Sequence, residues 1–155
     1  MLSKNEINQW RTRGYVVMKN FINVKSCIKH MENVYPKDDK NPVLDFGSGG
    51  KTRFPCNIES IDSISVHMNL INAVKQLLNT ENIRLTQSVA WAKYGVPPVD
   101  EQSNCEQRIH MDYGNNTWLH PPKWNTPNAV AAIVYYSNTN ITGGSTALVE
   151  RLGDD

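Results

Sequence analysis

The stretch Gln107-Arg108-Ile109-His110-Met111-Asp112-Tyr113 decides the predicted fold, because polar and apolar side chains alternate along it. A β-strand places successive side chains on opposite faces. One face would therefore carry Arg108, His110 and Asp112, while the other face would be apolar. An imidazole and a carboxylate two residues apart on one face can bind the same metal ion. The same alternation is typical of an ordinary half-exposed antiparallel strand, so the pair alone leaves both interpretations open.

The composition favours a single globular domain, 1–155. The chain has 155 residues, a formal net charge of +1, 39% hydrophobic residues and 20% charged residues. The nearly neutral charge gives no electrostatic reason to expect nucleic acid or a membrane surface as a partner, and no apolar run reaches membrane-spanning length. The polar start does not resemble a signal peptide. Three cysteines without zinc-like spacing (Cys27, Cys56 and Cys105) predict reduced thiols in a cytoplasmic protein.

Helical signals dominate the first half of the chain. Ser3 and Glu6 form a possible capping box for a short helix that ends near Gly14. Asn23 can cap a second helix that continues to about Tyr35. Further along, an apolar stripe at helical spacing predicts a third helix over 63–79, closed by an asparagine.

Strands are predicted where side chains alternate or where short apolar runs occur. These segments are 15–18, 83–94, 107–113, 129–137 and 145–150. Between the second and third helices, a stretch rich in Lys, Asp, Gly and Pro predicts a long loop over 36–55. A turn is expected over 138–144. Helices followed by a run of strands favour an α+β chain whose later part is a β-sandwich or barrel.

Three segments, in this order, resemble the phytanoyl-CoA dioxygenase-like branch of the Fe(II)- and 2-oxoglutarate-dependent oxygenases. Residues 13–22 (RGYVVMKNFI) are similar to that family's opening helix-strand signature, residues 107–113 to its metal strand, and residues 143–149 (GGSTALV) to the strand after the turn. The resemblance implies N-terminal helices packed on a double-stranded β-helix, or jelly roll. It also implies Fe(II) bound by His110, Asp112 and a distal histidine, with 2-oxoglutarate chelating the iron and O2 as cosubstrate.

The implied reaction is hydroxylation of an aliphatic C–H in a small organic or lipid-like substrate, coupled to decarboxylation of 2-oxoglutarate to succinate. Family members bind the cosubstrate with side chains from the strands before and after the metal strand. Gln87 and Lys93 are the candidates on the first strand, since Lys93 can pair with a carboxylate. Tyr135 is the candidate donor on the second, with Thr146 behind it. Each of these residues also fits an ordinary strand.

The chain departs from the family pattern in its last third. No histidine follows His120, Arg151 comes too early to anchor the far carboxylate of 2-oxoglutarate, and about five strands are found where a jelly roll needs about eight. We therefore expect the N-terminal part of a longer enzyme, with an incomplete jelly roll. Three roles are open for His120: it completes the metal site, it faces the substrate, or it is a solvated loop residue. The alternative is a non-catalytic, truncated or degenerate oxygenase-fold protein whose His110 and Asp112 bind no iron or bind it idly.

Overall fold

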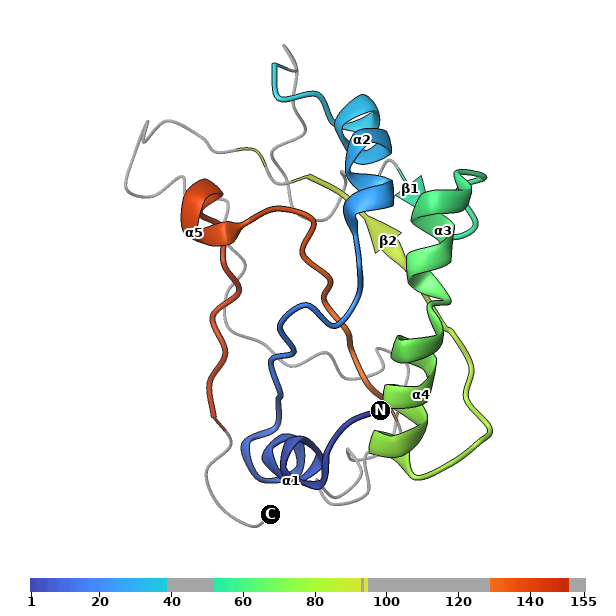
Figure 1. The fold of residues 1–155 in the computed structure, drawn as a ribbon, viewed down its shortest axis with the longest axis vertical. Helices are drawn as coiled ribbons and strands as arrows, with labels where there is room; N and C mark the ends of the chain where they lie inside the picture. The colour runs from blue at the N-terminus through green and yellow to red at the C-terminus, as the bar shows by residue number, and fades with distance from the viewer. Residues whose placement is uncertain (39–51, 93, 95–128, 151–155) are drawn as a thin grey trace, which may run out of the picture.

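The computed structural model describes residues 1–38, 52–92, 94 and 129–150, and combines helices with one small antiparallel sheet (Figure 1). The elements are α1 (Lys4–Arg13), α2 (Lys25–Val34), β1 (Thr52–Arg53), α3 (Glu59–Ser65), α4 (Met68–Leu78), β2 (Val89–Ala90) and α5 (Thr139–Thr142). Helix α2 lies alongside α3, and α1 packs against α4. The class is α+β, as the sequence predicts.

Helix α1 confirms the predicted capping box and its predicted end. The Ser3 hydroxyl accepts a hydrogen bond from the Glu6 N–H at 3.2 Å, and the Glu6 carboxylate accepts one from the Ser3 N–H at 2.6 Å. At the other end Gly14 has a φ of 83°, and its N–H donates to the Trp10 carbonyl at 2.9 Å. Glycine fits this left-handed conformation because it has no Cβ.

Helix α2 also forms where predicted, although it begins one residue later than expected. Val24 is the residue before the first helical turn and provides no side-chain cap. The Asn23 side-chain oxygen nevertheless accepts a hydrogen bond from the Lys25 N–H at 3.1 Å, so it satisfies a donor at the helix start.

The prediction of one helix over 63–79 is wrong, because the chain forms α3 and α4 with a break at 66–67. The His67 ring accepts a hydrogen bond from the Asn69 N–H at 3.2 Å and thereby caps a new helix. The predicted end of α4 is confirmed, since Asn79 follows it with a φ of 52°. Helix α3 begins earlier than expected, at Glu59.

The Asp62 carboxylate in the first turn of α3 is hydrogen-bonded to the backbone of the preceding loop. Asp62 accepts hydrogen bonds from the Cys56 N–H at 2.9 Å and from the Asn57 N–H at 3.0 Å. The Cys56 N–H contributes most to lowering the pKa of Asp62 below its ordinary value of 3.8, and the Cys56 side chain and the Asn57 N–H contribute further. The ionised form of Asp62 is therefore more stable in the folded chain than in the unfolded chain.

This lowered pKa predicts a stability difference that depends on pH. The folded state gains from ionised Asp62 above pH 3.8, and the gain is lost as the pH falls through the lower folded value. Asp62→Asn should therefore lower the Tm more at pH 7 than at pH 2, measured by thermal unfolding. Asp38→Asn, which removes an exposed carboxylate, is the control. An equal effect of Asp62→Asn at both pH values would contradict this explanation.

The predicted strands are mostly wrong where the structure describes them. Within 83–94 only Val89–Ala90 forms a strand, which pairs with β1 in the register Thr52↔Ala90 and Arg53↔Val89. Strand β1 lies within the region predicted as a loop. The described segments 15–18, 129–137 and 145–150 are not assigned as strands, and α5 occupies part of the predicted turn.

The jelly roll predicted for the later part of the chain is therefore not seen in the described residues, whose sheet consists of β1 and β2. Two side-chain hydroxyls donate hydrogen bonds to a backbone carbonyl of this sheet, and one of them comes from the residue that follows α2. Thr52 is 4% exposed, and its hydroxyl donates to the Ala90 carbonyl at 2.6 Å. The Tyr35 hydroxyl, just after α2, donates to the same carbonyl oxygen. The strand predicted over 107–113 lies outside the described residues.

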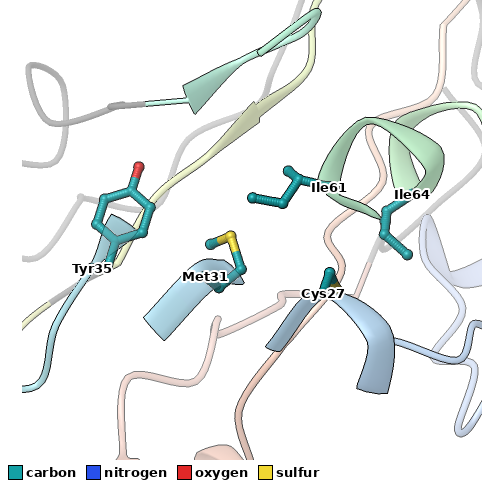
Figure 2. Close-up of a cluster of buried hydrophobic side chains, with 5 residues drawn as sticks. All are labelled: Cys27, Met31, Tyr35, Ile61 and Ile64. Carbon is teal, nitrogen blue, oxygen red and sulfur yellow. The ribbon is translucent and has the colours of Figure 1, made fainter. Parts of the chain in front are cut away.

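Two apolar clusters form the described core. The first lies between α2 and α3 and contains Cys27, Met31, Tyr35, Ile61 and Ile64 (Figure 2). The second joins the N-terminus to α4 and contains Leu2, Ala73 and Leu77. Gln76 of α4 fixes the backbone of Leu2, accepting from its N–H at 2.7 Å and donating to its carbonyl at 3.3 Å. Across the described ranges, no helix is long and apolar enough to cross a membrane.

Candidate functional site

Three of the six predicted site residues can be located in the structure. Gln87, Tyr135 and Thr146 lie in the described residues, whereas Lys93, His110 and Asp112 lie outside them. Among the residues that are described, no group of three or more His, Cys, Asp or Glu side chains could hold a metal ion. The described part of the candidate site therefore consists of predicted cosubstrate residues.

Tyr135 and Thr146 are brought together by two hydrogen bonds. The two hydroxyl groups are hydrogen-bonded to each other, and the Thr146 N–H donates to the Tyr135 hydroxyl oxygen at 2.9 Å. Tyr135 is 44% exposed. The pair holds a phenol hydroxyl in a defined position at the surface, where it can bond a polar ligand.

The loop between these two residues contains α5 and two consecutive glycines. Asn138 caps α5, because its side-chain oxygen accepts from the Asn140 N–H at 3.1 Å. Gly143 and Gly144 have φ values of 71° and 72°, and a Cβ added to either would meet no atom within 4 Å. The backbone conformation, and not a lack of space, therefore favours glycine at both positions. This turn returns the chain so that Thr146 meets Tyr135.

Tyr136 differs from its neighbour because it lies against the core between α2 and α3. Burial, with smaller contributions from the nearby Cys27 and Cys56, raises the pKa of Tyr136 to about 12. Both of these cysteines are free thiols. Consecutive side chains that alternate between solvent and core are typical of an extended segment with one packed face. Of the two neighbouring tyrosines, Tyr135 is thus the one that is available to a ligand.

The other located candidate, Gln87, has no described contact with the Tyr135–Thr146 pair. Its side chain is exposed, on the segment that leads into β2. The neighbouring Ser88 instead links this segment to α3, through a hydrogen bond of 2.8 Å between the Ser88 and Ser65 hydroxyls. Within the described residues, the structure therefore does not join Gln87 to the other two candidates.

Sequence reasoning missed contacts between the end of the segment 145–150 and the residues that end and follow α1. Arg13 forms an ion pair with Glu150, with 3.1 Å between Nε and Oε1, and the Tyr15 hydroxyl donates to the same carboxylate oxygen at 3.5 Å. These contacts place the segment that carries Thr146 beside the end of α1 (Figure 1). Both charged side chains are about half exposed, so the pair contributes little to stability. No local sequence signal indicates a contact over this separation.

Comparisons with known proteins do not add to this description. The chain matches no protein-family model, no curated protein and no solved structure. A functional assignment therefore depends on the residues of this chain and their chemistry.

Proposed function

We propose that this chain belongs to an Fe(II)- and 2-oxoglutarate-dependent dioxygenase that hydroxylates an aliphatic C–H of a small organic or lipid-like substrate. The observation that carries the proposal is the His110-Met111-Asp112 spacing within an alternating stretch. For the later part of the domain we propose the jelly roll that the resemblance to this family implies. The opposite environments of Tyr135 and Tyr136 support a strand-like segment with one face turned outward.

The proposed metal site uses the donor types that Fe(II) prefers. An imidazole nitrogen from His110 and a carboxylate oxygen from Asp112 are two of the three ligands in a two-His-one-carboxylate site. His120 is the candidate third ligand within this chain. When bound, iron with 2-oxoglutarate and O2 supplies the oxidising chemistry, and the protein contributes binding, orientation and exclusion of water.

In the proposed cosubstrate site, hydrogen-bond donors of the protein bind the carboxylates of 2-oxoglutarate. Tyr135 would donate its hydroxyl hydrogen to a carboxylate oxygen of 2-oxoglutarate, and Thr146 would hold that hydroxyl in place. The Lys93 ammonium would pair with the same ligand, because its charge complements a carboxylate. Gln87 would donate from its side-chain amide. Of these roles, that of Tyr135 is supported best, because its hydroxyl is held by hydrogen bonds and the residue is 44% exposed.

The Tyr135 role predicts a specific kinetic change. Tyr135→Phe removes the hydroxyl and keeps the ring, so we expect the KM for 2-oxoglutarate to rise by roughly tenfold, the effect of losing a hydrogen bond to a charged group. The Tm should change little, because the side chain is 44% exposed. The measurement is the rate of succinate formation as a function of 2-oxoglutarate concentration.

Position 146 provides the matched controls for this experiment. Thr146→Ser keeps a hydroxyl that can bond Tyr135 and should leave the KM nearly unchanged, whereas Thr146→Val removes it and should raise the KM. An unchanged KM in Tyr135→Phe would exclude Tyr135 from the cosubstrate site. It would leave the proposed iron site to be tested separately.

The proposed function is tested by Fe(II)-dependent formation of succinate. If His120 completes the iron site with His110 and Asp112, the purified chain should release succinate from 2-oxoglutarate when Fe(II) and O2 are both present, and release none after treatment with a chelator. Zn(II) is the matched metal control, because it binds the same ligand types but has no redox chemistry. Release that is absent with Fe(II), or equal with Zn(II), would show that these three residues do not form a working iron site in this chain.

A further inference from the structure

We draw no further inference here: the strongest candidate, the exposed apolar side chains Val17, Ile133, Leu148 and Val149 on the segments 15–18, 129–137 and 145–150, carries nothing because no described contact joins them into one surface or shows what covers them.

Discussion

Replacing His110 with alanine is expected to reduce Fe(II)-dependent succinate formation by more than about 100-fold. Mutations of residues that only support a metal ligand already cost roughly 10- to 100-fold in metal affinity or activity, and removal of a ligand should exceed that range. Asp112→Ala should have a comparable effect, because it removes the carboxylate ligand. The measurements are the initial rate of succinate formation and the Fe(II) content of the protein after gel filtration.

Two control substitutions separate loss of the metal from loss of the fold. Met111→Leu changes the residue between the two ligands without removing a metal donor and should leave the rate within about twofold, since Leu and Met are similar in volume. His30→Ala removes an exposed histidine on α2, whose ring is hydrogen-bonded to the Ser60 hydroxyl at 2.7 Å. Full activity in His110→Ala would show that His110 is not an iron ligand.

The second large expected effect concerns stability. Ile61→Ala should lower the free energy of unfolding by about 3 kcal/mol, the usual cost of removing most of a buried isoleucine side chain. Ile61 is 4% exposed and packs between α2 and α3, where it faces Met31 (Figure 2). Urea denaturation at neutral pH measures this change, and an unchanged m-value would show that the two unfolding transitions can be compared.

Ile141 provides a matched control for the same chemical change. Its side chain is 82% exposed on α5, so Ile141→Ala should change the free energy of unfolding by less than about 0.5 kcal/mol. If the two substitutions had equal effects, the cluster between α2 and α3 would not be the main stabilising core of the described residues.

Helix ends were predictable where a few neighbouring residues determine them. The capping box of Ser3 and Glu6 requires only residues three positions apart, and Gly14 and Asn79 mark helix ends through their backbone conformations. The break between α3 and α4 was missed because the apolar stripe continues across it. The break depends on a cap by His67, and histidine is not among the residues that usually cap helices.

Strands were harder to predict because a strand depends on a partner elsewhere in the chain. β1 lies in a stretch whose Gly, Pro and Lys content indicates a loop, yet Thr52 is buried and pairs with Ala90 of β2. Alternation over 83–94 predicted a long strand, but only Val89–Ala90 finds a partner in the described residues. Strand propensity reflects packing against neighbours, so the sequence of one segment is insufficient.

Two of the candidate site residues chosen from the sequence are hydrogen-bonded to each other in the structure. Tyr135 and Thr146 were chosen from consecutive predicted strands, and the glycine turn between them returns the chain to form their hydrogen bonds. Their binding role remains a prediction. The contact between Arg13 and Glu150 was missed, because an ion pair between distant residues leaves no pattern along the chain.

Binding of 2-oxoglutarate to iron held by the chain is the most direct test of the central proposal. In an anaerobic titration with Fe(II) and 2-oxoglutarate, the wild-type chain should develop the weak visible charge-transfer band of the iron chelate. His110→Ala should show no band under the same conditions. No band in the wild type, or equal bands in both proteins, would contradict an iron site at His110 and Asp112.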